Sequence, residues 1–240
     1  ISKYRLLQDM KKEYEGYYRS VKNALLACER NENLGKGVRG VLAELVTSPK
    51  EYEKALEVAL GSSIQNIVTE TQEDAKDIIN YLKKNNLGRV TFLPMSAMSS
   101  RYLNKGEQNL LNQEGVIGVA SEILKYSSEY KNIIEYLLGR VLIVKTIEDG
   151  IRVSKMCNYS LKIVSLQGDI LNPGGSMTGG SLNTGNTNLL GRERQIKELK
   201  NEIENLRLEQ ENTIEIKEKL ENSINNLELN LKEIDNQIND

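Results

Sequence analysis

The chain has 240 residues, and its 32 basic and 34 acidic side chains nearly balance, which argues against a general attraction to nucleic acid or anionic membranes. It has no histidine and only two cysteines, Cys28 and Cys157, which excludes Ser–His and Cys–His catalysis and zinc sites built from clustered Cys and His. No apolar run approaches the roughly 20 residues of a membrane span, and no signal peptide opens the chain. We therefore expect a protein of the reducing cytosol in which both cysteines are free thiols, with a disulfide between them as the alternative.

Residues 1–34 are predicted to form a first coiled-coil arm. Apolar positions recur there at alternating spacings of three and four, with charged residues between them. Such a narrow stripe is typical of a coiled-coil seam rather than of a surface helix on a globular domain. Because the pattern is already running at Ile1, we read the chain as an excised part of a longer protein. The seam positions are Leu7, Met10, Tyr14, Tyr17, Val21, Ala24 and Cys28.

The middle of the chain contains an internal repeat. Residues 37–61 and 115–139 align without a gap at an offset of 78, and ten of the 25 positions are identical. The similarity continues after a three-residue shortening, where Thr71-Gln-Glu-Asp74 is answered by Thr146-Ile-Glu-Asp149. We therefore predict two pseudo-symmetric subdomains, at 35–110 and 111–188.

Each half of the repeat predicts the same alternation of strands and helices, and hence a mixed α/β (α+β) body with two small sheets. A capping box at Ser48-Pro49-Lys50-Glu51 begins one helix, glycines at 61 and 139 end a helix in each half with a left-handed residue, and Thr71 and Thr146 cap the next helices. The predicted strands are 38–42, 64–69 and 89–93 in the first half and 116–120, 141–145 and 161–166 in the second.

A glycine-rich segment closes the second half. Gly174, Gly175, Gly179 and Gly180 allow positive φ and close approach of another backbone, and Met177 between them offers an adaptable apolar contact. Such a stretch fits an interface built by strand addition, with a loop that has no partner as the alternative. A phosphate-binding loop is disfavoured, because no G-K-[ST] ending follows and no G-x-G-x-x-G is present.

Residues 189–240 are predicted to be a second coiled-coil arm, whose last 45 residues would span about 70 Å at 1.5 Å per residue. One register of alternating threes and fours runs throughout, interrupted only by a polar trio at its centre. The two arms could pair antiparallel with each other, or each could find its partner in another chain. The seam positions are Ile196, Leu199, Ile203, Leu206, Gln210, Thr213, Lys217, Leu220, Ile224, Leu227, Leu231, Ile234 and Ile238.

Several motifs, in order and between two heptad arms, resemble the hinge of bacterial SMC (structural maintenance of chromosomes) proteins. The segment GDILNPGGSMTGG at 168–180, followed by LLGR at 189–192, is similar to that family's GD-x-x-x-PGGSMTGG…LLGR signature. In the first half, GVRGVLAELV at 37–46 and GRVTFLP at 88–94 are similar as well. The resemblance covers residues 35 to about 195 and extends over the flanking arms.

The resemblance implies a noncatalytic, cofactor-free homodimerisation hinge with an intramolecular antiparallel coiled coil. In this family subdomain I of one chain pairs with subdomain II of another, so that the arms form a V or ring. The parent protein would be a nucleoid-associated ATPase of chromosome condensation and segregation that entraps DNA. Its ATPase heads, and the accessory subunits that contact them, would lie outside this chain.

The family also implies weak, sequence-independent DNA contact near the junction of hinge and arms, which salt would weaken. The candidate side chains are Lys36, Arg39, Lys155, Lys162, Arg192 and Arg194. The loop 182–188, LNTGNTN, departs from many relatives because it is uncharged, which lowers the expected affinity.

Two other kinds of protein compete with this interpretation. One is a small-molecule-binding or enzymatic α/β domain with helical extensions, which the lack of histidine and of paired catalytic groups disfavours. The other is a coiled-coil rod with a globular insertion and no chromosomal role, which predicts no self-association through residues 168–181.

Overall fold

A computed structural model describes residues 2–180 and 188–239, with side chains described up to residue 232. The chain divides into two compact units, each treated by itself below. The body is Leu7–Gln195, and the arm unit combines Ile1–Leu6 with Ile196–Asp240. The finer division into arms at 1–34 and 189–240 and subdomains at 35–110 and 111–188 stays a prediction.

The first predicted arm is not one continuous helix. It consists of α1 (Ser2–Lys12), α2 (Arg19–Arg30) and the short α3 (Glu32–Gly35). The break lies where Tyr14 and Gly16 take positive φ values of 53° and 85°. After the break, Tyr17, Val21, Ala24 and Cys28 are buried in the core of the body. The prediction of a single seam was therefore wrong beyond α1, because a helix that packs on a globular core can show the same spacing.

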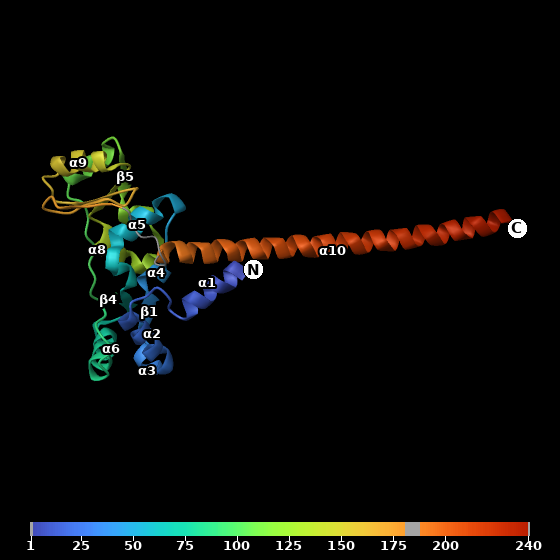
Figure 1. Cartoon of the computed structure of the whole chain (residues 1–240), viewed down its shortest axis with the longest axis horizontal. Helices are drawn as coiled ribbons and strands as arrows, with labels where there is room; N and C mark the ends of the chain where they lie inside the picture. Colours follow the sequence, from blue (N-terminus) through green and yellow to red (C-terminus); the bar gives the residue numbers. More distant parts are fainter. Residues whose placement is uncertain (1, 181–187, 240) are drawn as a thin grey trace. The chain divides into compact units, whose positions relative to one another are not determined.

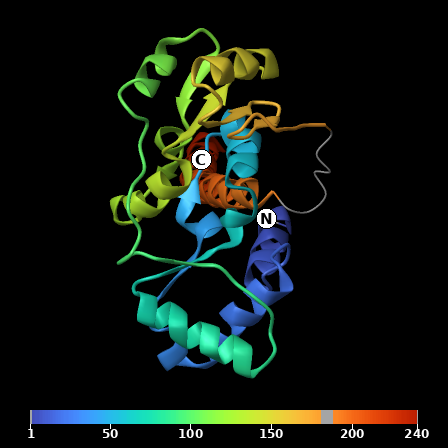
Figure 2. The same cartoon turned by 90° about the vertical axis from the view of Figure 1, so that its left-hand side faces the viewer.

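The first half of the body has a three-stranded sheet of order β1-β3-β4, in which β3 is antiparallel to β1 and parallel to β4. The residues between β4 and the second half run along one side of the body, as Figure 2 shows in green. The elements of this half are β1 (Val38–Val41), α4 (Leu42–Leu45), β2 (Val46–Thr47), the 3-10 turn η1 (Lys50–Tyr52), α5 (Glu53–Leu60), η2 (Gly61–Gln65), β3 (Ile67–Thr69), α6 (Gln72–Lys84) and β4 (Phe92–Pro94).

The second half has a larger sheet of order β10-β9-β8-β7-β5. Figure 1 places α9 and β5 at one end of the body and α3 and α6 at the other, with α5 and α8 between them. The elements are η3 (Glu107–Asn112), β5 (Val116–Val119), α7 (Ala120–Ile123), β6 (Lys125–Tyr126), η4 (Ser128–Tyr130), α8 (Lys131–Leu138), β7 (Val141–Val144), α9 (Ile147–Met156), β8 (Lys162–Ser165), β9 (Ile170–Leu171) and β10 (Met177–Thr178).

The predicted internal repeat is confirmed element by element. From β1 to α5, each helix and the first strand recur 78 residues later, so that α5 at 53–60 corresponds to α8 at 131–138, and β2 recurs as β6 with a shift of one residue. Both first strands bulge at a glycine of positive φ, Gly40 in β1 and Gly118 in β5. The repeat-related residues Thr47 and Lys125 pair with each other across the β2–β6 sheet. The two halves are therefore related by a local twofold axis near this pair.

The predicted threonine caps are confirmed in both halves. The Thr71 hydroxyl accepts the Asp74 N–H at 3.2 Å, and the Thr146 hydroxyl accepts the Asp149 N–H at 3.2 Å. Each aspartate packs against a glycine of the preceding strand region, Gly37 or Gly115, where a Cβ would lie 2.1 Å from the carboxyl carbon. The cap and the glycine thus form one repeated unit.

The predicted capping box at Ser48 was wrong, and the prediction of left-handed glycines at two helix ends was correct for only one of them. Ser48 does not cap a helix: its hydroxyl donates to the Pro49 carbonyl, and Pro49 leads into the turn η1 before α5 begins. Gly61 has the predicted positive φ, of 54°, whereas Gly139 is right-handed with φ −68°. Gly139 is required for space instead, because a Cβ there would lie 1.9 Å from the Arg101 carbonyl oxygen.

One hydrophobic core joins both halves, and a smaller one lies within the second half. The large core includes the repeat-related residues Leu56 and Ile134, both fully buried, together with Leu189 and Leu190 at the start of α10 (Leu189–Asn239). Burying each such side chain contributes roughly 1.5–3 kcal/mol. The first turn of α10 is thus part of the core that joins the two halves.

Candidate dimerisation interface and arm junction

The glycine-rich segment forms a hairpin at the edge of the second sheet. β10 pairs antiparallel with β9 through Met177↔Leu171 and Thr178↔Ile170. No other described strand pairs with the outer edge of β10, and both of its residues are exposed, Met177 by 50%. An unpaired strand edge of this kind is a template for pairing with another chain.

The four glycines shape this hairpin in different ways. Gly174 and Gly175 have φ values of 86° and 94°, which the turn between β9 and β10 requires. A Cβ on Gly179 would lie 2.6 Å from the Asp169 carboxylate, whereas a Cβ on Gly180 would meet nothing within 4 Å. The adjoining Ser181 and most of the uncharged loop 182–188 lie outside the described residues. The glycines thus expose the edge of β10, and their contact with a second chain stays a prediction.

The first sheet has a complementary open edge. β4 is its last strand, and Pro94, which lacks an N–H, is tolerated there because no neighbouring strand uses it. Beside this edge lies a shallow groove of about 270 Å³. Its lining is mainly apolar and comes from α6, from β4 and from the segment just before β4: Gln72, Ala75, Lys76, Ile79, Val90, Phe92 and Pro94. Sequence reasoning missed this edge.

The start of α10 is held by carboxylates of α5. Glu57 accepts the Leu189 N–H at 3.0 Å, while Asn188 donates its side-chain amide to Glu53 and accepts the Gly191 N–H. A Cβ on Gly191 would lie 2.0 Å from a Glu53 oxygen, so the glycine of the LLGR motif is required for this approach. Lys11 of α1 also pairs with Glu193 of α10 at 2.8 Å. These contacts, all within the body, hold the first turn of α10 against α5 and tie it to the end of α1.

Burial sets the protonation of several groups at this junction. It raises the pKa of Glu57 to about 7, with the charge of Glu53 adding to the effect and the Leu189 N–H opposing it. Burial likewise raises the pKa of Glu44, which accepts the Tyr17 hydroxyl at 3.0 Å.

Cys28 and Cys157 are both free, and burial raises the pKa of Cys28 to about 11, so its thiol is unreactive at neutral pH.

Comparison with known proteins identifies the family. The model described as "SMC proteins Flexible Hinge Domain" matches residues 35–154. The chain belongs to the SMC hinge family. The matched domain is the hinge alone, which is not catalytic. Among the described residues, no cluster of three or more His, Cys, Asp or Glu could hold a metal ion, and no helix could span a membrane.

Relatives and solved structures agree with this assignment. The chain is 41% identical over 209 residues to "Chromosome partition protein Smc" of Desulfitobacterium hafniense and 40% identical over 199 residues to that of Bacillus subtilis. These matches cover 87% and 82% of this chain but only 17% and 16% of those proteins. The chain thus spans about one sixth of its curated relatives. Its fold matches an asymmetric dimer of the Geobacillus stearothermophilus SMC hinge domain, with TM-score 0.77, 32% identity and coverage of 85% of this chain and 80% of that one.

Two hinge residues predicted to contact DNA make contacts within the body, where Arg192 is buried and Arg194 is half-buried. Arg192 is 6% exposed, lies over the Tyr17 ring at 5.4 Å and donates to the Glu15 carbonyl, while its Nε and Nη2 find no described partner. Arg194 Nε donates to Glu53 at 2.7 Å, with little exposure of either side chain. Both guanidinium groups are engaged within the fold, which disfavours phosphate contact, and their assignment to DNA stays a prediction. Their partners lie more than 100 residues away, which no local pattern reveals.

The other four candidates are distributed over the hinge rather than gathered. Lys36 and Lys155 are exposed, and Arg39 is exposed but forms an ion pair with Glu70 at 3.0 Å. Lys162 is half-buried and donates to the Ala59 carbonyl at 2.7 Å, which ties the second half to the end of α5. Lys36, Arg39 and Lys155 therefore stay candidates for DNA contact, whereas Lys162 is held by the hinge itself.

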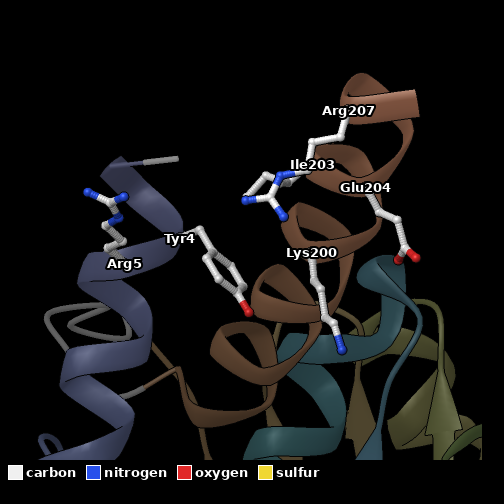
Figure 3. Close-up of a pocket in the computed structure, with 6 residues that line it drawn as sticks. All are labelled: Tyr4, Arg5, Lys200, Ile203, Glu204 and Arg207. Carbon is white, nitrogen blue, oxygen red and sulfur yellow. The ribbon is translucent and has the colours of Figure 1, made fainter. Parts of the chain in front are cut away.

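The arm unit contains a basic cavity that sequence reasoning missed. It has a volume of about 410 Å³ and lies between α1 and α10 (Figure 3). Lys200 and Arg207 are seven residues apart and so share one face of α10, which was the signal available in the sequence. On the same helix, Leu206 and Leu220 of the predicted seam are more than half exposed. The lining residues are Tyr4, Arg5, Lys200, Ile203, Glu204 and Arg207.

Proposed function

We propose that this chain is a homodimerisation hinge in which the β10 edge of one copy pairs with the β4 edge of a second copy. Because each copy carries both edges, two such contacts would close a ring. The observation that carries the proposal is that β4 ends the sheet of the first half and β10 ends the sheet of the second, on a body whose halves are otherwise alike. The dimer of the similar Geobacillus hinge adds support.

The side chains beside the two edges complement each other. Met177 projects from β10 with half of its surface exposed, and the groove beside β4 is lined by Ala75, Ile79 and Phe92. A methionine adapts its shape to such a groove, and main-chain pairing of the strands would supply the affinity. Pairing also removes both exposed edges, which otherwise invite nonspecific aggregation.

The wider role follows from the relatives named as chromosome partition proteins. In a parent SMC protein the hinge would join two arms into a V or ring, with ATPase heads at the far ends, and the ring would entrap DNA in chromosome condensation and segregation. Such a protein would work in the cytoplasm, on the nucleoid. The arms would pair antiparallel within one chain, as suggested by the adjacency of α1 and α10.

Sedimentation equilibrium tests the dimer directly. The parent chain should be dimeric at micromolar concentration, and Met177→Glu should weaken the dimer at least roughly a hundredfold, because it places a charge in an apolar contact. Leu208→Glu is the matched control, since it changes a similarly exposed apolar side chain on α10. A monomeric parent, or equal weakening by both variants, contradicts the proposal.

We further propose weak DNA contact through the basic cavity of the arm unit, with Arg5, Lys200 and Arg207 as the phosphate ligands. These side chains come from both helices of the arm unit and border one cavity, a placement that suits phosphate contact without base readout.

Fluorescence anisotropy with a short duplex tests this contact at low salt. Changing Arg5, Lys200 and Arg207 to Gln should reduce affinity severalfold and flatten the dependence on salt. The matched control changes three exposed lysines elsewhere, Lys84, Lys105 and Lys145, and so alters net charge equally. Equal loss in both triple variants would show a general charge effect and contradict the assignment to the cavity.

A further inference from the structure

An unusual backbone conformation lies next to the β9–β10 hairpin. Asn158 and Tyr159 follow α9, and both are left-handed, with φ values of 49° and 56°. Asparagine is common in this conformation, whereas a tyrosine is rare because its Cβ crowds the neighbouring carbonyl oxygen. Tyr159 is 42% exposed, so burial of its ring in the core does not account for the strain.

The contacts of Tyr159 point to the hairpin. Its carbonyl oxygen accepts the Gly174 N–H at 2.9 Å. Its ring packs against Gly175, where a Cβ would lie 3.5 Å from ring atom Cδ1. Within the hairpin, the turn is closed by short-range hydrogen bonds, such as that from the Asn172 N–H to the Ser176 carbonyl at 2.8 Å. One residue thus holds both glycines of the turn.

The internal repeat provides a comparison for this residue. In the first half, the Leu87 N–H bonds the Leu82 carbonyl at 3.0 Å just as the Tyr159 N–H bonds the Ser154 carbonyl at 2.8 Å, so Leu87 is the counterpart of Tyr159. Leu87 is not left-handed; the chain there turns at Gly88, with φ 91°. The first sheet also has no hairpin after its last strand, β4. The strained tyrosine occurs only in the half that has a hairpin to hold.

We propose that Tyr159 is a positioning residue for dimerisation. Its carbonyl and its ring fix the hairpin turn so that the free edge of β10 is presented to a second copy. β9 and β10 have two residues each, too few for a hairpin to be stable by itself, so an external hold pre-organises the edge. This inference rests on the proposed dimer and names a residue that does not itself belong to the pairing edge.

Three substitutions separate the ring from the backbone strain. Tyr159→Ala removes the ring and should lower dimer affinity roughly tenfold, as loss of pre-organisation does elsewhere. Tyr159→Phe keeps the ring and should restore affinity to within about twofold of the parent. Tyr159→Gly removes both ring and strain, and should lose affinity like Tyr159→Ala while melting at the same or a higher temperature. Tyr18→Ala, which removes another exposed tyrosine ring, is the matched control.

Amide hydrogen exchange gives the readout that a purely structural role would not change. In Tyr159→Ala the Gly174 amide should exchange faster, while amides of the buried strand β7 keep the parent's rates. If Tyr159→Ala fails to fold, the same comparison is made on Tyr159→Leu, which carries the first half's residue at this position.

The outcomes for the dimer and for the tyrosine are distinct. A monomeric parent chain contradicts the proposed function itself. A dimeric parent whose Tyr159→Ala variant dimerises equally well, or whose Gly174 amide stays protected, contradicts the positioning role alone. Faster exchange in the β7 amides as well would also contradict it, because the residue would then be stabilising the whole subdomain.

Discussion

The two halves of the body share their strands, helices, caps and glycine bulges, yet they differ at the last strand of each sheet. The first sheet stops at β4 and leaves its edge open, whereas the second continues from β8 into the β9–β10 hairpin. The repeated part builds a common core, and the part that is not repeated creates a second, different edge. A body with two different edges can join a second copy through two equivalent contacts, each pairing one kind of edge with the other.

The halves also use the same helix in two ways. Glu53 and Glu57 of α5 hold the first turn of α10. The corresponding residues of α8 are Lys131 and Glu135, and the Glu135 carboxylate instead accepts the Tyr102 hydroxyl of the segment that connects the halves. α5 thus contacts the start of α10, whereas α8 contacts the segment that connects the halves. The charged residues of the two helices differ accordingly.

The shared core gives the largest expected effect. Leu56→Ala and Ile134→Ala change repeat-related, fully buried residues, and each should lower the free energy of unfolding by about 2–5 kcal/mol. Chemical denaturation should give one cooperative transition in both variants, because one core joins the halves. Two separate transitions, or a large cost in one half only, would break the equivalence of the halves.

Divergence at the repeated helix gives the next effect. Arg194→Ala leaves the buried Glu53 carboxylate without its cation and should cost about 2–4 kcal/mol. Lys131→Ala changes the repeat-related position of Glu53, where an exposed Lys131 lies 3.9 Å from Glu135, and should cost less than about 0.5 kcal/mol. Similar costs for the two variants would show that the arm junction is no more demanding than an ordinary surface.

The smallest effect is a pH dependence at the same junction. Burial raises the pKa of Glu57 from 4.5 to about 7, so between these values the folded chain holds a proton that the unfolded chain has released. The contribution of Glu57 to the free energy of unfolding is therefore greatest below about pH 4.5 and disappears as pH rises through about pH 7. Glu57→Gln keeps an acceptor for the Leu189 N–H but does not ionise. The free energy of unfolding of this variant, relative to that of the parent chain, should therefore increase as pH rises from about 4.5 to about 7. Parallel curves would contradict the assignment.

Sequence reasoning predicted the repeat, the mixed fold and the threonine caps, because these are recorded locally in residue types and spacing. It misread α2 as coiled coil, since Val21, Ala24 and Cys28 have the same spacing whether they face a partner helix or the core. It missed Glu53 and Glu57 and the contacts that Arg192 and Arg194 make within the fold, because the partners of these arginines are brought close only by the fold. The strands β9 and β10 have only two residues each, too few to be predicted from an alternating pattern, although the glycines around them were identified.

Cross-linking between chains tests the pairing of β10 with β4 most directly. Met177→Cys and Lys76→Cys would be made in separate chains that also carry Cys157→Ser, mixed in equal amounts and treated with a short bis-maleimide linker. Pairing of β10 with β4 predicts covalent dimers from this mixture, and few from a control mixture of Met177→Cys and Tyr18→Cys. Linkage of Met177→Cys chains to one another, or equal yields from both mixtures, would contradict it.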